Sequence, residues 1–133
     1  MIFVDTSFWV ALRMRRDRHH EQAATLLGEH RTAGLVTTTL VVGETWTFLN
    51  RRAGHSAAVD FLDRVGSSPR LDVVSLAPDH ESEALAFLRR RDEREYSYVD
   101  ATSFSLMRGL RVRRCLAFDG DFTAAGFHEL RPP

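Results

Sequence analysis

Short apolar runs alternate along the chain with longer segments in which apolar residues recur every three or four positions. The runs are typical of strands buried in a parallel sheet, and the longer segments are typical of amphipathic helices. This alternation predicts an α/β domain with a mostly parallel sheet of four to five strands flanked by helices. We predict strands at residues 2–4, 35–38, 71–76 and 114–118 with a last edge strand at 127–130, and helices at residues 6–15, 20–33, 40–52, 56–65, 78–91 and 98–110, followed by a short helix after residue 121.

Two acidic residues stand at the ends of predicted strands. Asp5 ends the first strand, and Asp119 ends the strand predicted at residues 114–118. The carboxyl ends of parallel strands lie at one edge of a sheet, and ligands of open α/β folds bind at that edge. We therefore expect the two carboxylates to lie close together at a functional edge.

Two further acidic residues lie on predicted helices at positions that the helical period assigns to the apolar stripe. Glu44 falls between Leu40 and Phe48, and Asp100 shares a helix face with Phe104. A carboxylate that faces a core is costly unless something pairs with it. A divalent cation makes four converging carboxylates favourable, and Mg²⁺ or Mn²⁺ prefers oxygen ligands. The four acidic residues together predict a magnesium site, which would also accept manganese.

Each acidic residue also has a purely structural interpretation, as a helix cap, a surface side chain or a turn residue. All four structural roles would have to coincide at one end of one sheet, so the convergence favours the metal site. The structural alternatives are helix capping by Asp5 and Asp100, a rim position or an ion pair with Arg51 for Glu44, and a turn around Gly120 for Asp119 and Asp121.

The composition excludes several functions. The 133 residues carry 18 basic and 18 acidic side chains, so bulk charge does not attract nucleic acid, although segregated patches can. All the basic residues are Arg, and without Lys neither a Walker A loop nor Schiff-base chemistry operates. The single Cys115 allows no intrachain disulfide or zinc framework and is predicted to be a core residue. We see no signal peptide and no membrane span, and expect a cytoplasmic protein.

Four acidic motifs follow one another along nearly the whole chain. They are Ile-Phe-Val-Asp5-Thr-Ser-Phe-Trp, Val-Val-Gly-Glu44-Thr, Tyr-Ser-Tyr-Val-Asp100-Ala-Thr-Ser and Leu-Ala-Phe-Asp119-Gly-Asp121-Phe. Their order and spacing resemble those of PIN domains of the VapC toxin type. The resemblance implies a single three-layer PIN-like domain over residues 1–133 that cleaves RNA with the help of Mg²⁺.

The resemblance also implies roles for individual residues. Ser7 resembles the hydroxyl that orients the first carboxylate, with Thr6 as the alternative for this role. Asp121 matches the family pattern less closely and would support the metal indirectly or through a water molecule. The catalytic and metal-binding residues that the resemblance implies are Asp5, Glu44, Asp100 and Asp119.

An RNA-cleaving enzyme needs positive contacts beside its acidic pocket. Cations also favour helix C-termini for purely structural reasons. The candidates for these contacts are Arg13, Arg15, Arg16 and Arg18 after the first predicted helix, Arg89, Arg90, Arg91 and Arg94, and Arg111, Arg113 and Arg114. The pair His19-His20 lies among these arginines, and we expect a solvated loop or an RNA contact there, not catalysis. The resemblance further implies a homodimer and a small antitoxin protein that occupies the groove of the toxin.

Other functions fit part of the pattern. A haloacid-dehalogenase-type phosphatase also carries Asp after its first strand, but it needs a second Asp where this chain has Ser7, and it needs a Lys. A non-catalytic binding module with the same fold is disfavoured by the intact acidic set. A PIN-type nuclease that acts on DNA, or on RNA outside any toxin system, is a third alternative.

Overall fold

The computed structural model describes residues 1–133 and confirms the α/β class. Five parallel strands form one sheet in the order β3-β2-β1-β4-β5. The strands are β1 (Ile2–Val4), β2 (Leu35–Thr38), β3 (Leu71–Val74), β4 (Arg114–Leu116) and β5 (His128–Glu129), and the helices are α1 (Thr6–Arg13), α2 (His20–Glu29), α3 (Thr39–Arg52), α4 (His55–Ser67), α5 (Pro78–Arg90), α6 (Tyr98–Leu110) and α7 (Asp121–Ala124).

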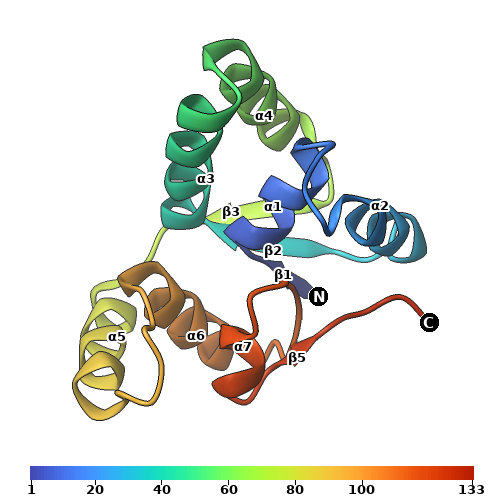
Figure 1. The fold of residues 1–133 in the computed structure, drawn as a ribbon. Coiled ribbons are helices and arrows are strands. Elements are labelled where there is room, and N and C mark those ends of the chain that lie inside the picture. Colours follow the sequence, from blue (N-terminus) through green and yellow to red (C-terminus); the bar gives the residue numbers. More distant parts are fainter.

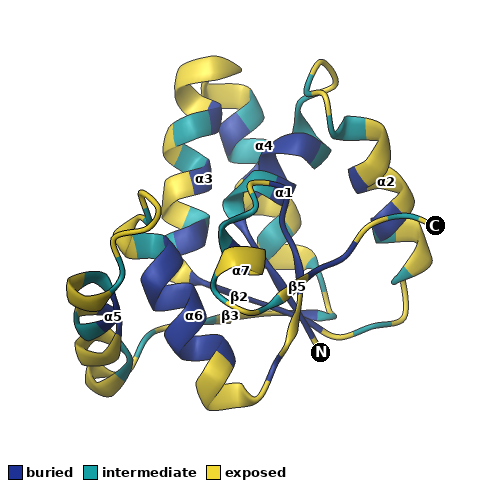
Figure 2. Cartoon of the chain, turned by 60° about the horizontal axis from the view of Figure 1, so that its bottom comes forward, coloured by how far each residue is buried: buried dark blue, intermediate teal, exposed yellow.

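The elements form three layers, with the sheet in the middle. In the view of Figure 1, α1 to α4 lie above the sheet, and α5 to α7 lie below it. The buried residues line the sheet and the inward faces of the helices, and α6 is buried along most of its length (Figure 2). Because α6 is covered on nearly all sides, the start of this helix is held rigidly against the sheet.

The register of the central strands brings two distant segments to one edge of the sheet. In β1 all three residues are fully buried, and the strand pairs with β2 on one side and with β4 on the other. Val4 lies opposite Leu116, and the backbone N–H of Asp5 donates to the Leu116 carbonyl over 3.0 Å. The residues that follow β1 and β4 therefore lie side by side, as the sequence predicted for parallel strands.

Several elements are shorter than predicted. The first helix ends at Arg13 instead of residue 15, and the second at Glu29 instead of residue 33. Strand β4 ends at Leu116, because the backbone N–H of Phe118 donates to the Ser7 hydroxyl instead of to a neighbouring strand. Asp119 consequently lies in the loop beyond the strand. None of the helices has the length and the apolar content that a crossing of the bilayer requires.

Candidate active site

Asp5 is held at the carboxyl end of β1 by the start of α1. Its side chain caps this helix, accepting the backbone N–H of Ser7 over 3.1 Å and the Ser7 hydroxyl over 2.7 Å. The residue is only 2% exposed. The capping role that the sequence left open is therefore real, and it coexists with a position at the functional edge of the sheet.

Two neighbouring hydroxyls serve two different carboxylates. Ser7 donates to Asp5 and accepts the backbone N–H of Phe118 over 3.0 Å, so it joins α1 to the loop after β4. Thr6 donates to Glu44 over 2.6 Å. Of the two hydroxyls considered for orienting the first carboxylate, Ser7 is the one in contact with it.

Asp100 occupies the third position of α6 and is part of a capping box. Its carboxylate accepts the backbone N–H of Ser97 over 3.0 Å, while the Ser97 hydroxyl accepts the backbone N–H of Asp100 over 2.9 Å. Asp100 is 7% exposed, and Phe104 on the same helix face is fully buried. The predicted inward position of Asp100 is confirmed. Its carboxylate is held in one orientation by the backbone.

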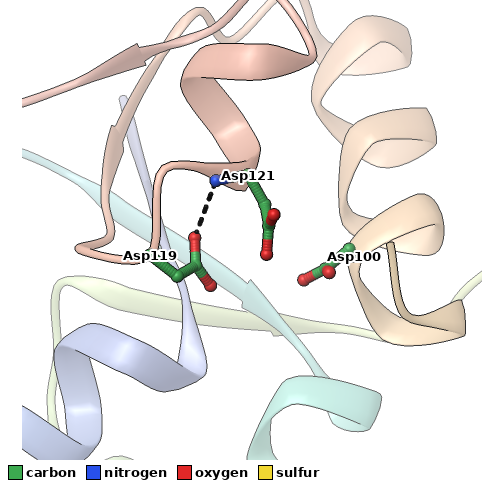
Figure 3. A group of neighbouring side chains, drawn as sticks. All are labelled: Asp100, Asp119 and Asp121. Carbon is green, nitrogen blue, oxygen red and sulfur yellow. Dashed lines mark hydrogen bonds between the residues drawn. The ribbon is translucent and has the colours of Figure 1, made fainter. Parts of the chain in front are cut away.

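Asp119 and Asp121 lie on either side of the turn that begins α7. The backbone N–H of Asp121 donates to the Asp119 carboxylate over 3.1 Å (Figure 3). Carboxylate oxygens of Asp100, Asp119 and Asp121 lie within 4.8 Å of one another. Figure 3 shows these three side chains converging from α6, from the loop before α7 and from the first residue of α7. Their spacing suits a shared cation with oxygen ligands.

Glu44 is exposed, which corrects the prediction that it faces the core. The buried stripe of α3 consists of Val41, Thr45 and Leu49, whereas Leu40 and Phe48 beside Glu44 are only half-buried. Glu44 nevertheless lines the same pocket as Asp5, Asp100 and Asp119. The pocket has a volume of about 360 Å³ and is lined by Asp5, Thr6, Ser7, Val10, Asp17, Arg18, His19, Glu44, Phe48, Asp100, Phe118 and Asp119.

Three acidic side chains of the pocket, those of Asp5, Asp100 and Asp119, have pKa values raised above the ordinary range. Burial, reinforced by the charge of Asp119 and opposed by the hydrogen bonds from Ser7, raises the pKa of Asp5 to about 8. Desolvation raises the pKa of Asp119 to about 6, with a hydrogen bond from the Asp121 backbone opposing the shift. Burial also raises the pKa of Asp100. A divalent cation would reverse these shifts, because it stabilises the ionised carboxylates.

The loop that carries Asp119 and Asp121 is held by Glu129, which was not predicted to belong to the site, and by Arg94, which was predicted only as an RNA contact. Glu129 on β5 is 6% exposed and accepts the backbone N–H groups of Gly120 over 3.3 Å and Thr123 over 2.8 Å. Arg94 donates to the Asp121 carboxylate over 2.8 Å. An acidic residue inside the predicted edge strand at residues 127–130 was the available signal for Glu129.

The arginines near the pocket differ in their freedom to bind a ligand. Arg13 donates to Asp60 on α4, so its guanidinium is already paired. Arg15 and Arg16 are exposed in the segment after α1, and neither lines the pocket. Arg18 does line the pocket. Of the four predicted RNA contacts after the first helix, Arg15, Arg16 and Arg18 make no side-chain hydrogen bond or ion pair within the protein.

Replacing Ser7 by Ala is expected to lower RNA cleavage by about 10- to 100-fold, the usual cost of losing a group that orients a metal ligand. The substitution should also raise the pKa of Asp5 further, because the lost hydroxyl hydrogen bond lowers it, while the backbone N–H of residue 7 still donates. In a Mg²⁺ titration at pH 7, the variant should bind the metal more weakly and need more Mg²⁺ to reach its half-maximal cleavage rate. At higher pH the metal affinity should partly recover. The exposed Ser56→Ala variant is the control, and an unchanged rate in Ser7→Ala would contradict the orienting role.

Comparison with known proteins shows the family to which the chain belongs. The sequence profile of the PIN domain matches residues 2–128, so the chain belongs to the PIN-domain family. The relatives named 23S rRNA-specific endonuclease VapC20, from two strains of Mycobacterium tuberculosis (CDC 1551 / Oshkosh and ATCC 25618 / H37Rv), are 49% identical to it over 132 residues, which is 99% of this chain and 99% of theirs.

A solved structure gives the same result in three dimensions. The crystal structure of Mycobacterium tuberculosis VapC20, described as a sarcin–ricin loop cleaving toxin, matches with a TM-score of 0.92 and 48% identity, over 99% of this chain and 100% of that one. The resemblance to VapC-type PIN domains is thereby confirmed, and the three-layer PIN-like fold with it. The chain is a VapC-type endonuclease by this homology, and the phosphatase interpretation is set aside.

Proposed function

We propose that this protein is a metal-dependent endoribonuclease that cleaves 23S rRNA in the sarcin–ricin loop and acts as the toxin of a toxin–antitoxin pair. The observation that carries the proposal is the whole-chain likeness to VapC20, at 49% identity and a TM-score of 0.92. The acidic pocket at the carboxyl ends of β1 and β4 supports it, because it supplies the oxygen ligands that such a reaction needs.

The donor set of the pocket fits a hard divalent cation. Every candidate ligand is a carboxylate, and burial together with repulsion from neighbouring carboxylates makes Asp5, Asp100 and Asp119 unfavourable as free anions. Mg²⁺, with Mn²⁺ as a close substitute, prefers such ligands. The residues proposed to hold the ion are Asp5, Glu44, Asp100 and Asp119, with Asp121 acting indirectly or through water.

The bound cation would activate a water molecule and offset negative charge on the phosphate. The residues of the chain orient the carboxylates for this task. Ser7 fixes Asp5, Thr6 fixes Glu44 and Ser97 fixes Asp100, each through a hydrogen bond. The pocket therefore presents its oxygens already positioned, so that little ordering remains when substrate binds.

The proposal extends to partners. The toxin type implies a cognate antitoxin, and a basic side chain of such a protein, placed in the acidic pocket, would neutralise the carboxylates in place of the metal. We also propose a homodimer, and a cytoplasmic site of action because the proposed substrate is ribosomal RNA.

Cleavage of a synthetic sarcin–ricin loop hairpin by the purified protein tests this function. With Mg²⁺ or Mn²⁺ we expect one cut within the loop, no cut with EDTA, and no cut by the Asp100→Asn variant. Undiminished cleavage by the variant would contradict the acidic site. Equal cleavage of unrelated hairpins would contradict the proposed rRNA specificity, and an uncut hairpin would contradict the proposed substrate.

A further inference from the structure

The segment between α1 and α2 forms one wall of the acidic pocket and is firmly held. His20 Nδ1 lies 2.8 Å from the carbonyl of Ala11, and the Asp17 carboxylate accepts the backbone N–H of His19 over 2.8 Å. The backbone N–H of Asp17 also donates to the Met14 carbonyl over 3.0 Å. These bonds fix the direction in which Arg18 and His19 leave the backbone. Both of these residues line the pocket.

The imidazole of His19 is stacked flat on the ring of Phe118. The two ring centroids are 4.5 Å apart, and the ring planes differ by 4°. Phe118 stacks in turn on Phe8, with centroids 5.9 Å apart and planes at 22°, and it is the residue directly before Asp119. The stack therefore places a fixed aromatic ring beside one of the proposed metal ligands.

One face of the His19 ring is covered by Phe118, yet 24% of the side chain is exposed. The ring is therefore partly accessible at the pocket that His19 lines. A flat ring that is held by a stack on one face and is still accessible to a ligand is a group on which proteins stack an unpaired nucleobase. Buried aromatic rings of the core offer no such access.

Arg18 supplies a positive charge to a pocket otherwise dominated by carboxylates. It is exposed, it makes no hydrogen bond or ion pair within the protein, and it lines the pocket beside His19. Arg13, by comparison, is paired with Asp60. A free guanidinium next to a stacking ring matches the two parts of a nucleotide, namely its phosphate and its base.

We infer that Arg18 and His19 form a nucleotide-binding subsite beside the metal pocket, in which the guanidinium binds an RNA phosphate and the imidazole stacks on an unpaired base next to the cleaved bond. The inference rests on the proposed ribonuclease function and deepens it. It assigns the substrate class: RNA whose base at this position is free of the helical stack, as in a loop, and not a continuous duplex, whose bases are covered on both faces.

Variants at His19 separate stacking from proton transfer. Loss of one base–aromatic stack typically weakens binding by about 10- to 100-fold, so we expect His19→Ala to raise KM for the hairpin by that factor with little change in kcat. His19→Phe keeps a flat ring without a titratable nitrogen and should restore KM. His30→Ala, at a histidine that does not line the acidic pocket, is the matched control. Arg18→Ala should also raise KM, and increasingly so at low salt.

Hairpins with a single abasic nucleotide locate the stacked base. With the wild-type protein, removal of the contacted base should weaken binding, and with His19→Ala the same removal should cost nothing further, because the partner ring is already absent. Binding measured by fluorescence anisotropy in the Asp100→Asn background gives this comparison without cleavage. Melting temperatures of all variants establish that each is folded.

Two results would overturn the subsite. One is a His19→Ala variant with unchanged KM and an unchanged abasic profile. The other is a His19→Phe variant as defective in kcat as His19→Ala, with an altered pH profile, which would make the imidazole a proton donor. Failure of the proposed function is a different result: the wild-type protein would neither cut nor bind the hairpin, whereas failure of the subsite leaves wild-type cleavage intact.

Discussion

Replacing Asp5 by Asn is expected to abolish RNA cleavage while raising the melting temperature of the metal-free protein. The amide of Asn caps a helix about as well as the carboxylate of Asp, so the bonds from Ser7 are retained. The variant loses a buried charge that Asp119 and Asp100 repel. Cleavage should fall by more than about 100-fold, because the loss of a residue that only orients a metal ligand already lowers activity by up to about 100-fold.

The stability gain has a defined pH dependence. Asp5 has a pKa of about 8 in the folded protein, above its value of about 4 in an unfolded chain. The folded state therefore binds this proton more tightly, and the resulting stabilisation is complete below about pH 4 and is lost as the pH rises through about 8. The difference in melting temperature between variant and wild type should be near zero at about pH 4 and should reach about 5 °C or more at about pH 8.

Thermal unfolding in EDTA at several pH values measures this difference, with the exposed Asp63→Asn variant as the control. Adding Mg²⁺ should raise the melting temperature of the wild type, because the ion binds the folded state, and should raise that of Asp5→Asn much less. A variant that is less stable than the wild type at every pH would show that Asp5 serves the fold and not a metal site.

Replacing Glu129 by Ala is expected to lower both stability and cleavage. Its carboxylate accepts two backbone N–H groups, from Gly120 and Thr123, and a third bond from Arg131 over 3.0 Å. Because Glu129 is buried, its removal leaves these donors without their acceptor, at a cost of about 2–3 kcal/mol. The loop with Asp119 and Asp121 also loses its anchor, so metal affinity should weaken about 10- to 100-fold.

Denaturant unfolding and Mn²⁺ titration check the two effects of Glu129→Ala separately. The exposed Glu95, which makes no side-chain hydrogen bond, provides a matched Glu→Ala control. The two carboxylates thus carry opposite predictions for stability: neutralising Asp5 stabilises the metal-free fold, and removing Glu129 destabilises it. Normal metal affinity in a folded Glu129→Ala protein would contradict the anchoring role.

Much of the site was accessible from the sequence, because strand ends are marked by apolar runs. Ile2–Val4 is bounded so sharply that Asp5 could only stand at the edge of the sheet. Asp100 was predicted to be buried because Phe104 lies on the same side of the helix, although α6 proves to be buried on nearly all sides. In both cases local periodicity carries the information that determines the position.

The remainder depends on contacts between distant segments. Glu44 was assigned to the core because Leu40 and Phe48 share its helix face, but these residues are themselves only half-buried. The pairing of Arg13 with Asp60 joins residues 47 positions apart, and no local pattern predicts it. Glu129 was not predicted because it acts by accepting backbone N–H groups across a turn. Such hydrogen bonds produce no pattern in the spacing of apolar side chains.

The most direct test of the acidic metal site is a crystal structure of the protein grown with Mn²⁺, with anomalous diffraction recorded at the manganese edge. We expect an anomalous peak among the carboxylates of Asp5, Glu44, Asp100 and Asp119, and its absence from crystals of the Asp5→Asn variant. A peak away from this pocket, or a pocket without manganese at saturating concentration, would contradict the central claim that these carboxylates form the metal site.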